Sequence, residues 1–307
     1  MSSGCRIGTR ASALARWQAE WVAGELRGLG VQVELVPIHT SGDADQQGPI
    51  GAIGTQGVFT SELQRALLAD EIDLAVHSLK DLPTDPVAGL ALAAVPARAS
   101  ADDALVAVSA DSFDALPGGA VVGTGSLRRR AQLLCERSDL QVRGIRGNVD
   151  TRLRKLDDGE FDAVILAVAG LVRLGCSESI TERLPHAVML PAVGQGALGL
   201  EARFDDDATR DAIAPLDHRA THAAVLAERS LLAALQGGCL APIAAYACPT
   251  DEVDELQLTA RVAHPEGRKR LDAVATAPLD EAEQLGRRVA DDLLDQGAAP
   301  LIAAART

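Results

Sequence analysis

The chain of 307 residues contains few aromatic side chains, which make up 2% of its residues. Proteins that bind single-stranded nucleic acid stack the bases on such side chains. Acidic residues outnumber basic ones, and the formal net charge at pH 7 is −14. This charge on average repels phosphate backbones and anionic lipids. We therefore expect neither a nucleic-acid partner nor a membrane partner.

Several other signals are missing from the sequence. No apolar run approaches the ~20 residues of a membrane-spanning helix, and the first residues contain no apolar stretch of signal-peptide length. The five cysteines are odd in number and lack CxxC spacing, which argues against a disulfide framework and a structural zinc site. The glycine fingerprints of nucleotide-binding loops are also absent. We expect a cytoplasmic protein without a metal ion.

Strand-like and helix-like segments alternate over the first half of the chain. The pattern predicts strands over 5–9, 31–38, 73–77, 90–95, 120–124 and 161–168, with a helix opened by Ser12, a helix at 60–69, a helix opened by Ser126 and a helix at 149–157. Such alternation is typical of parallel sheets with right-handed crossovers. The sequence therefore predicts an α/β fold with doubly wound sheets.

Breaks in this pattern divide the chain. Polar or glycine-rich stretches lie near 97–103 and 191–203, and a long helical pattern begins near 217. Roughly three strands and a C-terminal helix follow it. The predicted domains are residues 1–98 plus 196–215, residues 103–192, and a smaller α+β domain over 218–307.

A basic segment over 128–155 is the strongest anomaly in composition, with nine basic and three acidic residues. The run Gly123–Ser126 separates a strand from a helix, so backbone N–H groups and two hydroxyls surround the same point as Arg128 and Arg129. Ligands of open α/β sheets bind at the carboxyl ends of strands. The segment therefore predicts an anion site, although a solvated helix face with salt bridges is the alternative.

The same pattern recurs after the next strand. Arg146, Gly147 and Asn148 follow that strand, and Arg152 lies further along the chain. Several guanidiniums at one sheet edge suit planar carboxylates, because each guanidinium binds a carboxylate as a two-pronged fork.

Two other segments place reactive groups next to strands. Lys80 and Asp81 follow a predicted strand, where they either neutralise each other or, if Asp81 faces a cleft, stabilise a cation and transfer protons. Cys239 follows two glycines between a helix and a strand. Most buried cysteines are inert, but a thiol on a glycine turn is accessible as a nucleophile or covalent tether.

Seven collinear segments together resemble the porphobilinogen deaminase (hydroxymethylbilane synthase) family. They cover nearly the whole chain: TRASALARWQAE, AVHSLKDLP, VGTGSLRRRAQL, IRGNVDTRL, ILAVAGLVRLG, LPAVGQGALGLE and LQGGCLAPIAAYA. The resemblance implies a transferase that joins four porphobilinogen molecules head to tail, with loss of ammonia, to give hydroxymethylbilane for tetrapyrrole biosynthesis. It also implies a monomer with two domains like periplasmic binding proteins and a smaller α+β domain.

The resemblance assigns roles to individual residues. It implies a dipyrromethane cofactor attached through a thioether to Cys239, and catalytic roles for Asp81 and Lys80. Its further cofactor-binding residues are Lys80, Asp81, Thr124, Ser126, Arg128, Arg129, Arg146 and Gly147. Its substrate-binding residues are Arg10, Ser12, Arg146, Arg152, Arg173 and Gln195, and Asp43 matches another active-site position.

The chain departs from the family pattern at three positions. Gln56 stands where many members have a lysine, in a glycine-rich stretch at 48–57 that we expect to be a mobile loop. Asp150 replaces a frequent glycine, and Leu240 follows the cysteine where a polar residue is common. We expect these changes to affect lid closure and rate rather than the reaction.

A different class of protein would also explain the arginines. A non-enzymatic protein that binds small anions on the same two-domain clamshell needs a basic strand-end site. It has no use for Cys239 after two glycines, so we favour the enzyme.

Overall fold

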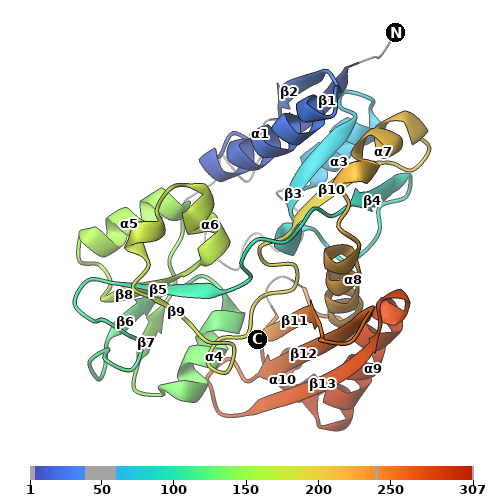
Figure 1. Cartoon of the computed structure of the whole chain (residues 1–307). Helices are drawn as coiled ribbons and strands as arrows, with labels where there is room; N and C mark the ends of the chain where they lie inside the picture. Colours follow the sequence, from blue (N-terminus) through green and yellow to red (C-terminus); the bar gives the residue numbers. More distant parts are fainter. Residues whose placement is uncertain (1–3, 39–59, 239–240, 306–307) are drawn as a thin grey trace. The chain divides into compact units, whose positions relative to one another are not determined.

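The computed structural model describes residues 4–38, 60–238 and 241–305 (Figure 1). Asp43, Gln56, Cys239, Leu240 and the stretch at 48–57 lie outside the described residues. The chain divides into two compact units, Met1–Arg98 with Ala197–His222 and Ala99–Gly196 with Ala223–Thr307. The division into three domains stays a prediction.

The first unit is built on a five-stranded sheet in the order β2-β1-β3-β10-β4. Its strands are β1 (Cys5–Thr9), β2 (Val33–Pro37), β3 (Leu74–Ser78), β4 (Leu90–Ala94) and β10 (Leu198–Arg203). Side chains alternate across β3, so Leu74 and Val76 share a core with α1 (Ala13–Gly28), while Ala75 packs with α3 (Ser61–Leu68). The two helices therefore cover opposite faces.

The second unit contains a five-stranded sheet in the order β7-β6-β8-β5-β9. Its strands are β5 (Asp103–Ala107), β6 (Val121–Gly123), β7 (Gln141–Arg143), β8 (Ala163–Ala167) and β9 (Glu182–Arg183). Its helix α4 (Leu127–Glu136) packs on one face, and α5 (Val149–Asp157) and α6 (Val168–Arg173) pack on the other (Figure 1).

The expected parallel pairing is present between β1, β2 and β3 and between β6, β7 and β8, but each sheet also contains one antiparallel strand that the sequence did not predict. Strand β10 runs antiparallel to β3 and β4, and β5 runs antiparallel to β8 and β9. Each is the first strand after the chain crosses between units, near residues 98 and 196. These strands therefore do not enter through a helical crossover on their own sheet, which would have made them parallel.

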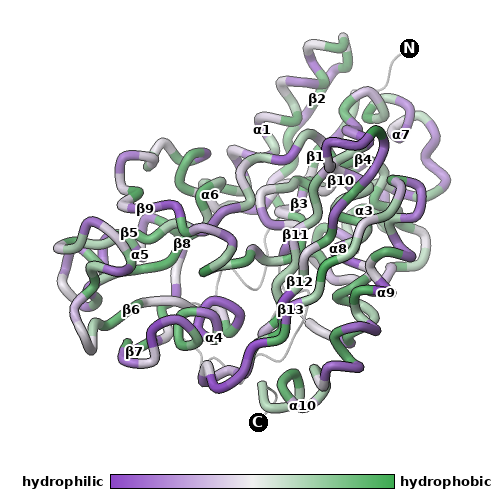
Figure 2. Tube along the Cα trace, turned by 60° about the horizontal axis from the view of Figure 1, so that its bottom comes forward, coloured by the Kyte–Doolittle hydropathy of each residue, from purple (hydrophilic) through white to green (hydrophobic). Residues whose placement is uncertain are grey.

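The rest of the second unit is an antiparallel sheet in the order β11-β12-β13 with helices against it. Its elements are β11 (Ile243–Pro249), β12 (Glu255–Ala263), β13 (Arg270–Pro278), α9 (Ala282–Asp295) and α10 (Ala298–Ala303). The buried face of α9 joins one core with the sheet, and the helix shows hydrophobic and hydrophilic stretches in Figure 2. The predicted α/β class with a smaller α+β part is confirmed.

Two further α-helices of the described residues are α7 (Asp207–Ile213) and α8 (Arg219–Ala234). Helix starts follow sequence signals, since Ser12 accepts from Ala15 N at 3.3 Å and Ser126 accepts from Arg129 N at 3.5 Å. Within the described part of the chain, no helix combines the length and apolar character that a membrane crossing requires.

An ion network at the start of β3 stabilises the first sheet. Asp73 accepts hydrogen bonds from Nε and Nη2 of Arg6 at 3.0 and 2.7 Å and from Nη2 of Arg203 at 3.1 Å. Burial raises the pKa of Asp73, but the bonds from Arg6 and Arg203 outweigh burial and lower it from 3.8 to about 2. The charged form of Asp73 is therefore stabilised by folding.

We expect Asp73→Asn to lower the free energy of unfolding by about 2 kcal/mol at pH 7. Because the folded pKa lies below the unfolded one, this contribution is present above pH 3.8 and is lost as pH falls towards about 2. Urea unfolding of both proteins across this range checks the expectation. Asp70→Asn is the control, since the Asp70 side chain is 72% exposed. A wild-type advantage that does not change with pH would contradict the assignment.

Candidate functional site

Four of the predicted site residues follow two neighbouring strands of the first sheet. Arg10 and Ser12 follow β1, and Lys80 and Asp81 lie in a 3₁₀ turn, η1 (Leu79–Asp81), directly after β3. Strands β1 and β3 are parallel, with Gly8 opposite Ala75. Their carboxyl ends therefore meet at one edge of the sheet, where ligands of such sheets bind.

Hydrogen bonds fix the end of β3 where the turn begins. Ser78 and Gln18 of α1 exchange hydrogen bonds of 2.7 and 3.2 Å. The backbone N–H of Leu79 donates to the carbonyl of Ala197 at 3.1 Å, and the Leu79 side chain is buried. The turn that carries Lys80 and Asp81 is thus held both by the buried Leu79 side chain and by the hydrogen bonds at Ser78 and Leu79.

The second sheet brings another predicted group together in the same way. Strands β6, β7 and β8 are parallel neighbours, so their carboxyl ends share an edge. Thr124 and Ser126 follow β6, and the backbone N–H of Ser126 donates to Oγ1 of Thr124 at 3.2 Å. Arg146 and Gly147 follow β7. The predicted hydroxyls and cations therefore gather at one sheet edge.

Gly147 is required by the geometry of its turn. Its φ is +106°, a conformation that side chains disfavour, and a Cβ there would lie 2.6 Å from Cγ2 of Thr151. The carbonyl of Gly147 accepts from Nε of Arg152 at 2.8 Å, which orients that guanidinium. Arg173, in α6 after β8, similarly donates to the carbonyl of Gly196 at 2.8 Å, and burial lowers its pKa to about 10.

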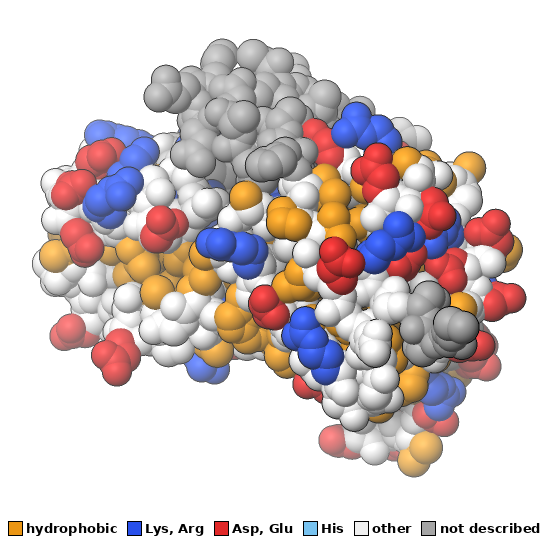
Figure 3. All heavy atoms as spheres, turned by 90° about the horizontal axis from the view of Figure 1, so that it is seen from above, with side chains coloured by type: hydrophobic (Ala, Val, Ile, Leu, Met, Phe, Trp, Pro, Cys, Tyr) orange, Lys and Arg blue, Asp and Glu red, His pale blue; other side chains and the backbone are white. Residues whose placement is uncertain are grey.

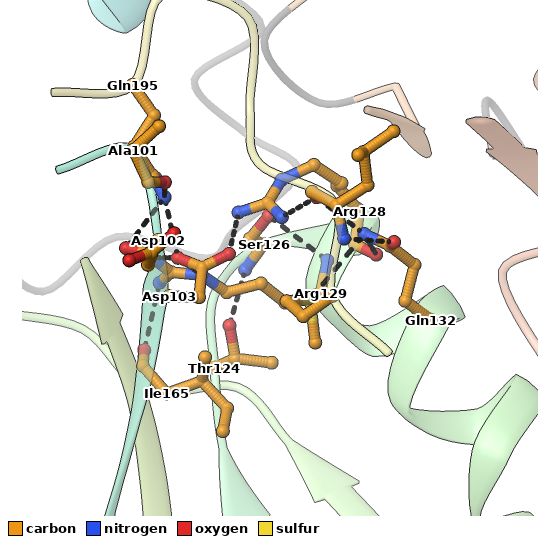
Figure 4. A network of polar contacts seen from close by, with 12 residues as sticks. Ala101, Asp102, Asp103, Thr124, Ser126, Arg128, Arg129, Gln132, Ile165 and Gln195 are labelled. Atoms are coloured by element: carbon orange, nitrogen blue, oxygen red, sulfur yellow. Dashed lines mark hydrogen bonds and ion pairs between the residues drawn. The ribbon is translucent and has the colours of Figure 1, made fainter. Parts of the chain in front are cut away.

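Arg128 and Arg129 converge on one buried carboxylate, that of Asp103 (Figure 4). Arg129 donates to Oδ1 of Asp103 from Nε at 3.1 Å and from Nη2 at 2.6 Å, and from Nη1 to the Ile165 carbonyl at 2.9 Å. Nη2 of Arg128 lies 2.8 Å from Oδ2 of Asp103. Nη1 of Arg128 donates to the Leu190 carbonyl at 2.7 Å.

Gln195 completes this network. Its Nε2 donates to Oδ1 of Asp103 at 2.9 Å and to the carbonyl of Ala101 at 2.6 Å (Figure 4). Gln195 is itself buried. Its amide is therefore used inside the protein, where it holds the carboxylate that orients the two arginines.

The network is buried and carries more positive than negative charge. Asp103 is 0% exposed, and Arg128 and Arg129 are 4% and 6% exposed. Burial raises the pKa of Asp103, but the two guanidiniums outweigh it and hold that pKa well below its usual range. Burial lowers the pKa of Arg128, although an arginine stays protonated. One carboxylate thus faces two cations.

One donor of this network is left unmatched. Nε of Arg128 is buried and has no hydrogen-bond partner among the residues that the structure describes. A buried unpaired donor on a cation is costly. The excess charge and this donor together suit an anionic ligand. On the face shown in Figure 3, by contrast, acidic and basic side chains are intermixed.

The sequence did not single out three contributors to this site. Asp103, Gln132 and the Leu190 carbonyl all contact Arg128 or its partners. Asp103 had a sequence signal, because it is a charged residue that opens the apolar strand β5. A backbone carbonyl has no such signal.

No metal centre is found in the described ranges. They contain no group of three or more His, Cys, Asp or Glu side chains placed to hold a metal ion. His218 and His222, which are four residues apart, bond instead to Thr221 at 2.9 Å and to Asp217 at 2.7 Å.

We expect Asp103→Asn to lower the free energy of unfolding by about 3–5 kcal/mol, because it leaves two buried guanidiniums without their counter-charge. Gln195→Leu removes a neutral donor from the same carboxylate and should cost about 1–3 kcal/mol. Chemical unfolding of the two variants measures both costs. An Asp103→Asn protein as stable as the wild type would show that this carboxylate does not hold the site together.

The chain matches two family models over most of its length. The model described as "Porphobilinogen deaminase, dipyromethane cofactor binding domain" matches residues 5–211. The model described as "Porphobilinogen deaminase, C-terminal domain" matches residues 222–295.

Solved structures similar to this chain include two bacterial proteins of low sequence identity. A putative methionine-binding lipoprotein from Bacillus subtilis is 12% identical, with a TM-score of 0.43, over 69% of this chain and 89% of that chain. A periplasmic substrate-binding protein of an ABC transporter from Coxiella burnetii is 14% identical, with a TM-score of 0.44, over 69% of this chain and 91% of that chain.

Proposed function

The chain belongs to the porphobilinogen deaminase family, transferases of tetrapyrrole biosynthesis with a dipyrromethane cofactor, and we propose that it is a hydroxymethylbilane synthase. In this proposal it joins four porphobilinogen molecules head to tail and releases one ammonia for each. Its ligands are then chains of pyrroles, each of which bears an acetate and a propionate group. A protein of net charge −14 needs a local excess of cations to bind them.

The observation that carries this proposal is the excess positive charge around Asp103. One buried carboxylate faces Arg128 and Arg129, and Nε of Arg128 has no partner in the described residues. A carboxylate of the dipyrromethane would supply both the missing charge and the missing acceptor. The donor set therefore fits this cofactor.

We assign the neighbouring residues of the same sheet edge to binding of the dipyrromethane as well. Thr124, Ser126, Arg146 and Gly147 follow β6 and β7, next to the start of α4. Hydroxyls, backbone N–H groups and a guanidinium there offer donors for several carboxylates. When bound, the dipyrromethane supplies the pyrrole carbon from which the product chain is extended.

Arg128 and Arg129 have different roles in this proposal. Nε, Nη1 and Nη2 of Arg129 each bond within the protein. We assign Arg129 to fixing Asp103 and β8, in addition to the cofactor contact that the family resemblance implies. Gln195 likewise acts on ligands through Asp103, because its amide is directed at that carboxylate.

We assign the binding of the carboxylates of incoming porphobilinogen to Arg10, Ser12, Arg152 and Arg173. Arg152 and Arg173 are each oriented by one bond to a backbone carbonyl. Orientation of a guanidinium before binding lowers the entropy that the side chain loses when it holds a carboxylate.

Asp81 carries the acid–base chemistry. Loss of ammonia leaves a positive charge on the substrate, which a fixed carboxylate stabilises electrostatically. The same carboxylate accepts the proton released when two pyrrole rings join. Lys80, beside it on η1, contributes a cation for ligand carboxylates.

Cys239 is the proposed cofactor attachment point, and Cys5 and Cys135 offer poorer nucleophiles. Burial, followed in size by the negative charge of Asp73, raises the pKa of Cys5 to about 12. Burial also raises the pKa of Cys135. Both thiols stay protonated at neutral pH, whereas the thiolate is the reactive form. Gly237, just before Cys239 in the chain, is confined, since a Cβ there would lie 2.4 Å from Cδ1 of Ile243.

We expect Asp81→Asn to lower the rate of hydroxymethylbilane formation by about 10²-fold or more, because it removes both the counter-charge and the base. The cofactor should stay attached, since the assigned attachment point is elsewhere. Ammonia release and product formation from porphobilinogen measure the rate, and intact mass reports the cofactor. Asp85→Asn, an exposed carboxylate close by in the chain, is the control.

Two results would contradict this proposal. A normal rate in Asp81→Asn would remove the role of that carboxylate. A wild-type protein that binds porphobilinogen but releases no ammonia would instead be the non-enzymatic anion-binding protein.

A further inference from the structure

Gln132 connects the arginine site to a neighbouring loop. It lies one helical turn after Arg128 on α4 and is buried. Its Nε2 donates to the Leu190 carbonyl at 3.0 Å, and its Oε1 accepts from the Leu190 N–H at 2.8 Å. The same Leu190 carbonyl accepts from Nη1 of Arg128 at 2.7 Å. Gln132 thus fixes the group that orients the Arg128 guanidinium.

Arg261 reaches this glutamine from a different sheet of the same unit. It lies on β12 and is 5% exposed. Its Nη1 donates to Oε1 of Gln132 at 2.9 Å and to the Ala187 carbonyl at 3.1 Å. Its Nε donates to Oδ1 of Asp272 on β13 at 2.6 Å. The guanidinium is therefore fixed at both ends.

The turn between β12 and β13 also packs closely on α4. Gly267 has a φ of +71°, and a Cβ there would lie 2.3 Å from the carbonyl carbon of Leu134. The hairpin that carries Arg261 therefore approaches the helix at its backbone. A side chain at position 267 would push the hairpin away from α4.

The antiparallel sheet of β11, β12 and β13 follows the proposed attachment point of the cofactor in the chain. Cys239, the proposed attachment point, comes just before β11, and β11 pairs with β12 so that Ala244 lies opposite Arg261. The sheet that follows the attachment point thus also carries Arg261, which contacts the helix that carries Arg128. In the proposed function, the cofactor is attached just before this sheet in the chain and is bound by Arg128 on α4. Its placement therefore depends on the contact between the sheet and the helix.

We infer that Arg261 is a positioning residue for the cofactor site. Through Gln132 and Leu190 it holds the Arg128 guanidinium in a fixed place relative to the sheet that follows the cofactor cysteine. This inference rests on the proposed function, because it takes the dipyrromethane as the ligand. A packing role alone would stabilise the protein equally with and without that ligand, whereas positioning affects the bound form.

The test compares Arg261→Met in two backgrounds, the cofactor-loaded protein and Cys239→Ser. Methionine fills the space without donating, and Arg270 still neutralises Asp272 at 2.8 Å. Thermal unfolding gives the stabilisation due to the cofactor as the difference between the two backgrounds. Intact mass reports occupancy, and kcat and KM are measured with porphobilinogen.

The matched control is Glu136→Gln. It removes an ion pair of 2.6 Å with Arg270 of β13, at the other end of α4 from Arg128. It therefore weakens the same helix–hairpin contact without touching Gln132.

We expect Arg261→Met to reduce the cofactor-dependent rise in unfolding temperature and to lower kcat/KM by about tenfold, since small misplacements of binding groups are costly. Glu136→Gln should change neither. If Arg261→Met does not accumulate as folded protein, Arg261→Lys, which keeps a cation beside Asp272, takes its place in the comparison.

Equal destabilisation of both backgrounds with an unchanged kcat/KM would overturn the inference while leaving the proposed function intact. A wild-type protein that carries no adduct on Cys239 and forms no product would instead remove the proposed function itself. Intact mass and activity of the wild type therefore separate the two failures.

Discussion

The structure of the proposed site depends on one buried carboxylate. Asp103 has no solvent exposure and lies between Arg128 and Arg129, which are themselves buried. The two buried cations beside this one anion gain further support from backbone carbonyls, since Ile165 accepts from Arg129 and Leu190 accepts from Arg128. The uncompensated positive charge is what makes the site receptive to carboxylates. The proposed function explains in this way how an acidic chain binds an acidic ligand.

The same network lies where the chain crosses between its two units. Asp103 opens β5, the first strand after one crossing, and Gln195 comes just before the other crossing. The Gln195–Asp103 bond of 2.9 Å and the bond of 3.3 Å from Ala99 N to the Gly196 carbonyl join the two crossing segments. Gly196 has a φ of +85°, and a Cβ there would lie 2.6 Å from the Ala99 carbonyl oxygen. Asp103, which holds Arg128 and Arg129, is therefore also bonded to the segment at the other crossing.

Much of this fold followed from local sequence patterns. Ser12 and Ser126 cap helices where predicted, and apolar runs mark β1, β3 and β8. The antiparallel directions of β5 and β10 did not follow, because they depend on which sheet the chain enters after a crossing. Composition also left open whether the basic run is a solvated face, yet Arg128 and Arg129 point inward. Their partner Asp103 is 25 or more positions away, a separation that local patterns do not connect.

In the proposed function, this chain carries its dipyrromethane on Cys239 and holds it with the Asp103 network. The most direct measurement is the intact mass of the purified protein, followed by peptide mapping of the fragment that contains Cys239. The account predicts an adduct of two linked pyrrole units on that cysteine. An unmodified protein that stays unmodified after incubation with porphobilinogen would contradict it.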